Sequence, residues 1–232
     1  MTAWRWAGAG LIALATAAAP DNAIAPFSAA KPGAALPAPW RATGVAKLRE
    51  ADVRLVEDEG RTVLRVHADN AFGTAAAQVQ LAAPIISWRW KVDRVLDRAR
   101  LGTRDGDDFA ARVYVTFEIP MEELTFAQRT RLKLARLFYG EVPSAAICYV
   151  WDNRSAKGSA IWSPYADRVR LVVLQSGGAG RWVEERRDVA ADFRAAFGRE
   201  APPVTGIAAG SDTDQTGESV TAWFGDFRVE AR

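Results

Sequence analysis

The clearest strand signal in the sequence is the stretch Phe109–Ile119, which reads FAARVYVTFEI. Its side chains alternate between apolar and polar, a period of two that predicts a β-strand with one face in a core. We expect the apolar face to be buried. The opposite face is either a binding surface or a charged network that sets strand register or meets solvent. The apolar face carries Phe109, Ala111, Val113, Val115, Phe117 and Ile119, and the other Asp108, Ala110, Arg112, Tyr114, Thr116 and Glu118.

Further short strands are expected on both sides of this stretch, separated by turn residues. Two helices interrupt them, one over residues 120–138 and one beginning near Asp188 and ending at Gly198. Many short strands with few helices predict a mostly β protein, an antiparallel β-sandwich of jelly-roll type with two peripheral helices. The expected strands are Arg61–Val66, Ala76–Leu81, Ile85–Val92, Ala145–Trp151, Ala160–Trp162, Val169–Leu174, Arg181–Glu185, Val204–Ala209 and Val220–Glu230.

Length and composition indicate a single domain with a substantial core. The chain has 232 residues, 49% of them hydrophobic and nine of them Trp. We expect a signal peptide over 1–25, an Ala/Pro-rich linker over 26–39 and one β-sandwich domain over 40–232. The net charge of +2 gives no electrostatic basis for binding nucleic acid.

The first residues resemble an export signal. Arg5 is followed by an apolar run from Ala7 to Ala19 and then by small residues, the order found in secretory leaders. The run is shorter than the roughly 20 residues of a membrane span. We therefore expect a periplasmic or secreted protein without membrane contact after leader removal. An uncleaved anchor, or a membrane contact through the basic helix at 120–138, is the alternative.

Polar residues of two expected strands are candidate ligand-binding groups. Arg112 and Tyr114 follow Asp108 along one strand, and Arg89 lies on the polar face of another. Arginine suits a carboxylate or phosphate, tyrosine stacks, and aspartate binds sugar hydroxyls.

A second candidate group is aromatic. Trp151 and Asp152 precede a Gly/Ser loop, and Trp162 and Tyr165 follow it. Exposed aromatic rings beside carboxylates hold pyranose rings in sugar-binding sandwiches. The alternative is that these rings are buried in a Trp-rich core.

The segment from Ser211 to Glu218 resembles the first half of a calcium loop. Asp212 and Asp214 stand at alternate positions before Gly217, but the place expected for a bidentate glutamate is Trp223. We expect no cofactor other than a candidate structural calcium held by Asp212 and Asp214. A polar hairpin turn is the alternative.

Established catalytic patterns are absent from the sequence. The only cysteine, Cys148, excludes an intramolecular disulfide and lies in an apolar run, which favours a buried thiol over a nucleophile. His67 is the only histidine, so neither a zinc cluster nor a Ser/His/Asp arrangement with a nucleophile elbow is indicated. Asp107 and Asp108 are neighbours and would point to opposite faces of a strand, unlike a glycosidase pair.

Several segments together resemble the exported bacterial proteins classed as domain of unknown function 3047. The resemblance covers about residues 40–230 and implies no established activity. Its segments also look like jelly-roll modules of the galactose-binding type, which is a likeness of fold. The segments are Ile86–Val92, Gly106–Val115, Tyr149–Trp151, Arg181–Arg187, Asp192–Phe193, Asp212–Gly217 and Ala222–Asp226.

We therefore expect a non-catalytic periplasmic binding module for a saccharide or another envelope component. One alternative is a carboxylate-dependent glycoside hydrolase or lyase, using Asp108 with a partner such as Glu118 or Asp152. The other is a structural envelope protein that contacts other proteins. The oligomeric state is open.

Overall fold

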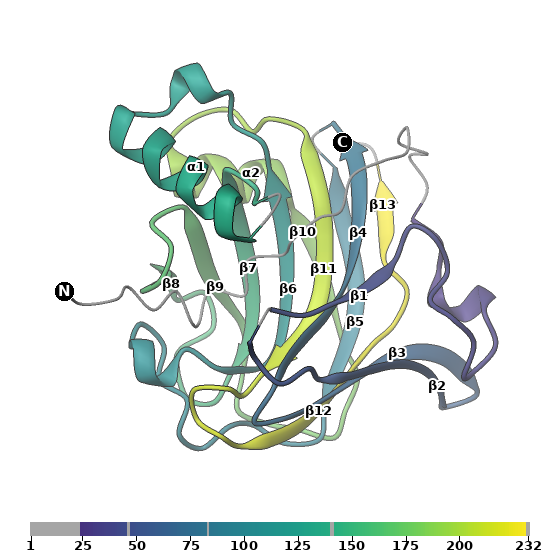
Figure 1. Cartoon of the computed structure of the whole chain (residues 1–232). Coiled ribbons are helices and arrows are strands. Elements are labelled where there is room, and N and C mark those ends of the chain that lie inside the picture. Colours follow the sequence, from purple (N-terminus) through teal and green to yellow (C-terminus); the bar gives the residue numbers. More distant parts are fainter. Residues whose placement is uncertain (1–23, 46, 83, 140–141, 231–232) are drawn as a thin grey trace.

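Two β-sheets pack face to face in the computed structural model of the chain (Figure 1). The structure describes residues 24–230 except 46, 83 and 140–141. The expected leader over 1–25 lies outside the described residues, apart from Ile24 and Ala25. The predicted mostly β sandwich with two helices is confirmed.

The larger sheet has seven strands in the order β1-β4-β11-β6-β7-β9-β8. Its pairs are antiparallel except β7 with β9, which run parallel. Strand β6, which carries the clearest alternation in the sequence, lies at the centre of this sheet and is buried along its whole length. The strands are β1 (Arg41–Thr43), β4 (Phe72–Leu81), β6 (Phe109–Phe117), β7 (Ala145–Asp152), β8 (Ala160–Trp162), β9 (Val169–Ser176) and β11 (Val204–Asp212).

The smaller sheet has six strands in the order β10-β5-β12-β3-β2, with β13 paired to β5. Figure 1 shows it behind and below the larger sheet. The strands are β2 (Asp52–Asp58), β3 (Arg61–Asp69), β5 (Ile85–Val92), β10 (Val183–Asp188), β12 (Ser219–Phe224) and β13 (Arg228–Glu230).

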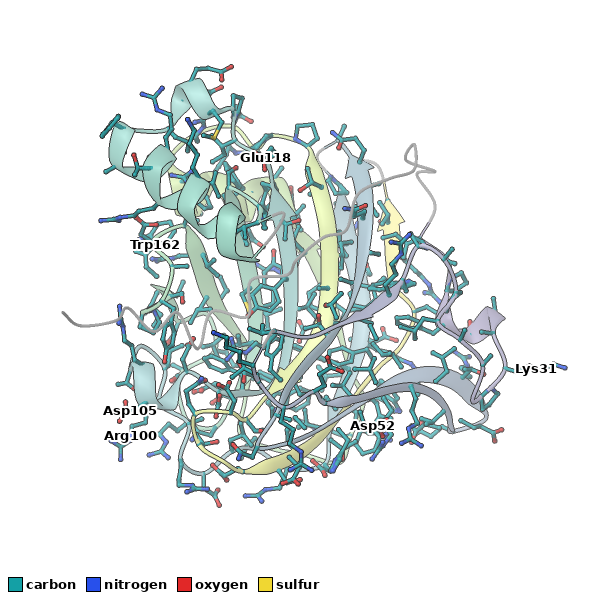
Figure 2. All side chains as sticks on the ribbon, viewed as in Figure 1. Lys31, Asp52, Arg100, Asp105, Glu118 and Trp162 are labelled. Carbon is teal, nitrogen blue, oxygen red and sulfur yellow. The ribbon has the colours of Figure 1, made fainter. Side chains whose placement is uncertain are left out.

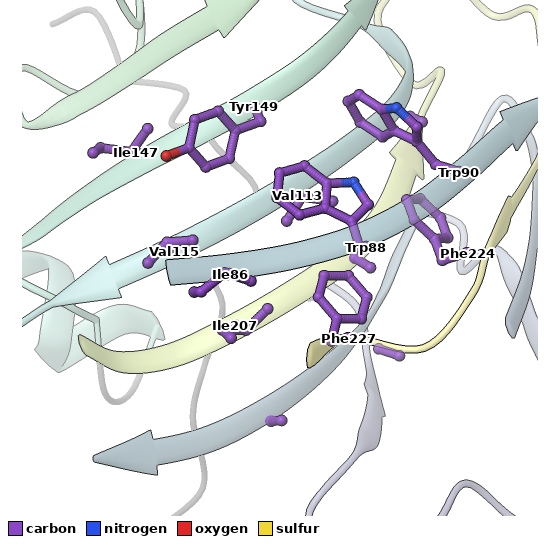
Figure 3. Close-up of a cluster of buried hydrophobic side chains, with 14 of the residues drawn as sticks. Ile86, Trp88, Trp90, Val113, Val115, Ile147, Tyr149, Ile207, Phe224 and Phe227 are labelled. Atoms are coloured by element: carbon purple, nitrogen blue, oxygen red, sulfur yellow. The ribbon is translucent and has the colours of Figure 1, made fainter. Parts of the chain in front are cut away.

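The main core lies between the sheets and is rich in tryptophan. Alternation along β5 directs Trp88 and Trp90 inward, where their ring centroids are 5.7 Å apart (Figure 3). Trp88 packs against Tyr149 of the opposite sheet at 5.5 Å, and Trp90 packs against Trp151 at 5.5 Å. Fully burying such rings stabilises the sandwich by several kcal/mol, roughly 25 cal/mol for each Å² removed from water.

Two α-helices join the sandwich at one end, α1 (Phe126–Tyr139) and α2 (Val189–Phe197). Thr125 and Gln128 form a capping box before α1, because each side chain accepts the other's backbone N–H. Asp188 caps α2, which ends at Gly198 in the left-handed conformation (φ 67°), as predicted. No helix among the described residues is long and apolar enough to cross a membrane. Three short 3₁₀ helices are η1 (Phe27–Ala29), η2 (Arg104–Gly106) and η3 (Met121–Glu123).

Several details differ from the sequence-based expectation. The strands β1 and β2 were not predicted, and the segment 220–230 forms two strands because Gly225–Phe227 interrupts it. The segment 26–39, expected to be a linker, contributes the buried Phe27 to the core beside Trp40 at 4.9 Å. Phe109 was expected on the core face. It lies on the outer side, since a register shift occurs where β6 meets β11.

Candidate functional site

The eight predicted ligand-binding residues lie in four separate parts of the sandwich. Tertiary structure therefore does not bring them together as one site. Arg112, Tyr114 and Asp152 belong to the outer face of the seven-stranded sheet, with Asp108 at its rim. Trp151 is in the core, Trp162 and Tyr165 lie at and after the edge strand β8, and Arg89 is on the outer face of the six-stranded sheet.

Arg112 is the centre of a buried network on the seven-stranded sheet. Its Nη2 is 2.9 Å from Oδ2 of Asp212 and also donates to the backbone carbonyl of Asp107. Its Nη1 donates to the Tyr114 hydroxyl at 3.0 Å, and its guanidinium lies over the Phe109 ring at 4.7 Å. Arg112 and Tyr114 therefore engage each other and their neighbours, which is the charged-network interpretation of this face.

Three aspartates converge beside this network. Asp108, Asp212 and Asp214 each offer a carboxylate oxygen, and these oxygens lie within 4.8 Å of one another. Asp108 also accepts the backbone N–H groups of Gln215 and Thr216, at 3.1 and 2.6 Å, which fixes the turn after β11 to the start of β6. The two predicted metal-ligating residues are thus brought together, and Asp108 joins them.

The titration of two buried groups near Arg112 is strongly altered. Burial raises the pKa of Asp107 to about 7; Arg112 opposes this rise, and Asp108 and Asp214 add to it. Burial likewise raises the pKa of the Cys148 thiol to about 12. Cys148 is therefore protonated at neutral pH, as a buried inert thiol would be.

The predicted aromatic cluster is divided between the core and the sheet edge. Trp151 is 2% exposed, and its indole N–H donates to the carbonyl of Gly177. Trp162 is 40% exposed and packs edge-on against Phe197 at 5.3 Å. Tyr165 donates its hydroxyl to the carbonyl of Arg104, whose guanidinium lies over the tyrosine ring. These rings do not form one sugar-binding platform.

Of the two predicted carboxylate pairs for glycoside hydrolysis, Asp108 with Glu118 is not brought together. Glu118 follows the far end of β6, about 30 Å from Asp108 at about 3.3 Å per residue. Figure 2 shows Glu118 beside α1 and Asp105, which precedes Asp108, at the opposite end. Asp152 lies at the same end of the sheet as Asp108, because Trp151 pairs with Ala111. Its carboxylate accepts the backbone N–H groups of Arg154 and Ser155, which shapes the turn after β7.

A polar groove of about 280 Å³ lies on the six-stranded sheet. Strand pairing places Glu184 opposite Arg89 and Arg186 opposite Ser87, so the outward side chains of β10 and β5 form one wall. Gly225 interrupts the wall beside Arg89 and donates its N–H to the Arg89 carbonyl. The charged side chains include Arg61, Arg89, Arg186, Arg228, Glu184 and Glu230.

Two cations of β5 contact tryptophan rings from neighbouring segments. The Arg89 guanidinium lies 4.2 Å from the Trp182 ring centroid. Lys91 Nζ lies 5.0 Å from Trp182 and 4.9 Å from Trp223. Asp58 completes this group, because it accepts Lys91 Nζ at 2.7 Å and the Trp182 indole N–H at 2.8 Å. Both tryptophan rings are half-buried, so part of each remains open to a ligand.

The groove is lined by charges of both signs, and one ion pair joins two of them. Arg186 pairs with Glu230, and Asp226 accepts from Ser28. Glu185 accepts from Trp90 and Gln175. Within the described part of the chain, three groove arginines (Arg61, Arg89 and Arg228) form no ion pair, and neither do the groove carboxylates Glu184, Glu185 and Asp226. Glu185 and Asp226 are held by the neutral donors named above, so the arginines and Glu184 are the charged groups open to a ligand.

Sequence reasoning identified Arg89 but missed the rest of this groove. Trp223 carried a signal, since it occupies the polar face of β12, whereas Trp182 precedes β10. The arginines come from β3, β5, β10 and β13, and their proximity depends on strand pairing that one sequence does not reveal.

The comparisons with known proteins concern the family and the fold. A family model described as "Protein of unknown function (DUF3047)" matches residues 38–228. No curated protein matches the chain.

Solved structures with a similar fold include endoglucanase cel12A from Rhodothermus marinus, which is 10% identical with a TM-score of 0.43. The match covers 83% of this chain and 92% of the endoglucanase. The xyloglucanase domain of NopAA from Sinorhizobium fredii, in complex with cellobiose, has 9% identity, TM-score 0.45 and the same coverages. TmCBM61 in complex with β-1,4-galactotriose has 10% identity, TM-score 0.33, and coverages of 84% and 90%. At these values the likeness is one of fold, and residue roles must come from this chain.

Proposed function

The chain belongs to the DUF3047 family, which is described as a family of unknown function. We propose that it is a non-catalytic binding module for an anionic saccharide. The binding surface of the proposal is the groove of the six-stranded sheet. We expect the leader over residues 1–25 to direct the module to the periplasm or outside the cell, where it would meet envelope saccharides.

The observation that carries the proposal is the set of three unpaired arginines in one groove. Arg61, Arg89 and Arg228 come from three different strands and line the same hollow. A guanidinium presents parallel N–H donors that match a carboxylate, which a uronic acid carries on each ring. Trp182 and Trp223 add apolar ring surface beside these donors, as saccharide recognition requires.

The size and polarity of the groove fit part of an oligosaccharide. Its volume of about 280 Å³ lies just below the roughly 300–1,000 Å³ of sites that enclose small molecules. A short stretch of a longer chain therefore suits it better than an enclosed metabolite. Ser87 and Ser28 supply hydroxyls to the same lining.

Calorimetry with matched oligosaccharides tests the proposal. We expect wild-type protein to bind an oligogalacturonate and to bind the neutral galactose oligomer of the same length at least tenfold more weakly. The double substitution Arg89→Ala and Arg228→Ala should remove binding. Arg54→Ala is the matched control, because Arg54 is exposed on the same sheet and pairs with Asp52 away from the groove. Absence of binding to both oligomers, or equal binding by the double variant, would refute the proposal.

The two alternative functions receive less support from the contacts described. Hydrolysis needs two carboxyls about 5–10 Å apart facing one cleft, and Asp108 and Glu118 stand at opposite ends of β6. A structural role through protein contacts is favoured by a large apolar patch. The large apolar side chains exposed in the described ranges are Phe126 and Trp162 alone.

A further inference from the structure

A cluster of buried carboxylates at the mouth of β6 and β11 has no part in the saccharide groove, which lies on the other sheet. We propose that Asp108, Asp212 and Asp214 bind a divalent cation of the calcium class, with Thr216 and Asp107 as neighbouring oxygen donors.

The spacing of the carboxylates fits a calcium ion. Their nearest oxygens lie within 4.8 Å of one another, and Asp108 and Asp212 are fully buried. Oxygen ligands about 2.3–2.6 Å from a common ion are separated by at most about 5 Å, so a single ion can reach all three. A donor set made only of oxygens suits Ca²⁺ or Mg²⁺ and does not suit zinc.

The charges around the cluster are not balanced by the chain. Asp107, Asp108, Asp212 and Asp214 bring four carboxyl groups to a region where, among the described residues, Arg112 is the cation in contact. Burying several like charges together is costly unless a counter-charge is present. A divalent cation supplies that counter-charge.

Within the part of the chain that the structure describes, several oxygen atoms without hydrogen-bond partners gather in the same two segments. Thr216 is 7% exposed, its Oγ1 has no partner, and its N–H holds the Asp108 carboxylate at 2.6 Å, which keeps the hydroxyl beside the cluster. Both carboxylate oxygens of Asp107, which is 1% exposed, also have no partner. The same holds for Asp214 Oδ1 and Gln215 Oε1. Buried polar atoms are ordinarily paired, so such a group of acceptors indicates a missing positive partner.

The bound ion would fasten the turn after β11 to the start of β6. Asp212 ends β11, Asp214 and Thr216 lie in the turn, and Asp108 precedes β6. The ion would thus have a structural role, joining segments more than 100 residues apart in the chain.

The test uses the full chain, stripped with a chelator and then titrated with CaCl₂ and with MgCl₂ in a calorimeter. We expect one calcium per chain and a higher melting temperature in calcium than in the chelator. Asp214→Asn should weaken calcium binding at least tenfold. Asp105→Asn is the matched control, because Asp105 is an exposed aspartate three residues from Asp108 (Figure 2).

Three outcomes would overturn the proposal. They are no binding heat at millimolar calcium, the same melting temperature with calcium and with the chelator, or unchanged affinity in Asp214→Asn. If circular dichroism shows that Asp214→Asn does not fold, Thr216→Val replaces it, with reduced calcium affinity expected. None of these results depends on whether the chain binds a saccharide.

Discussion

The guanidinium of Arg89 lies over the ring of Trp182, with Cζ 4.2 Å from the ring centroid. Arg89 lies on β5 and lines the groove, and Trp182 immediately precedes β10, the strand that pairs with β5. Gly225 makes this placement achievable, because a Cβ added there would lie 2.5 Å from Arg89 Cγ. The Arg89 side chain is thus held between the Trp182 ring and the backbone at Gly225.

Gly225→Ala should therefore displace Arg89 and weaken saccharide binding. A cation–aromatic contact of this kind contributes about 0.5–2 kcal/mol, so we expect a loss of affinity of about two- to thirtyfold. Calorimetry with the oligogalacturonate measures it. In the Arg89→Ala background the same glycine substitution should have no further effect on affinity. An equal loss in both backgrounds would show that Gly225 acts independently of Arg89.

Arg112→Met should destabilise the fold strongly. The substitution keeps the aliphatic stem but leaves the buried Asp212 carboxylate without its ion-pair partner. Breaking such a pair costs about 3–5 kcal/mol. Urea denaturation measures the change, with Arg131→Met as control, because the exposed Arg131–Asp167 pair should contribute less than about 1 kcal/mol. Equal effects of the two substitutions would contradict the role of Arg112.

Two tryptophans that the sequence grouped together should differ in their effect on stability. Trp151→Ala removes a 2% exposed ring that packs against Trp90, and it should cost about 3–5 kcal/mol. Trp162→Ala removes a 40% exposed ring and should cost less, about 1 kcal/mol. Chemical denaturation of both variants decides this, and similar costs would mean that Trp162 is also a core residue.

Glu185 should make the stability of the fold depend on pH. Burial raises its pKa above the usual 4.5, although hydrogen bonds from Gln175 and Trp90 oppose the rise. In the pH range from about 4.5 up to that raised value, the folded state binds more protons than the unfolded state. The unfolding free energy therefore falls as pH rises through this range.

Glu185→Gln should remove this contribution while keeping an acceptor for Trp90. The unfolding free energy of wild type and variant, measured from pH 4 to 8, gives the difference. We expect the variant to gain stability relative to wild type as pH rises. Asp58 titrates in both proteins and cancels from the difference. A difference that stays constant with pH would show that Glu185 has the same pKa in both states.

Much of the fold was predictable because strand alternation and helix caps are local signals. The inward face of β5, the helix between Asp188 and Gly198, and the alternation of β6 from Ala111 onward follow from neighbouring residues. The short β1 and the mixed-polarity β2 carry little alternation. Phe109 was assigned to the core because a register shift cannot be seen in one strand alone.

The sites were less predictable than the strands. Asp212 and Asp214 were recognised because their spacing is local, whereas Asp108 joins them across more than 100 residues. Arg112 and Tyr114 suggested a ligand surface, yet Arg112 contacts both Tyr114 and Asp212 in the folded chain. A polar side chain on a strand has the same pattern whether it meets a ligand or another residue.

From the sequence alone, most of the strands, the inward face of β5 and the bounds of α2 could be predicted. Those properties depend on side-chain alternation and capping over a few residues. The tertiary structure alone decided that Arg89 faces Trp182 in a groove while Arg112 is enclosed by Asp212 and Tyr114. The physical reason is that the order and register of strands depend on packing between distant segments, which is a property of the whole chain.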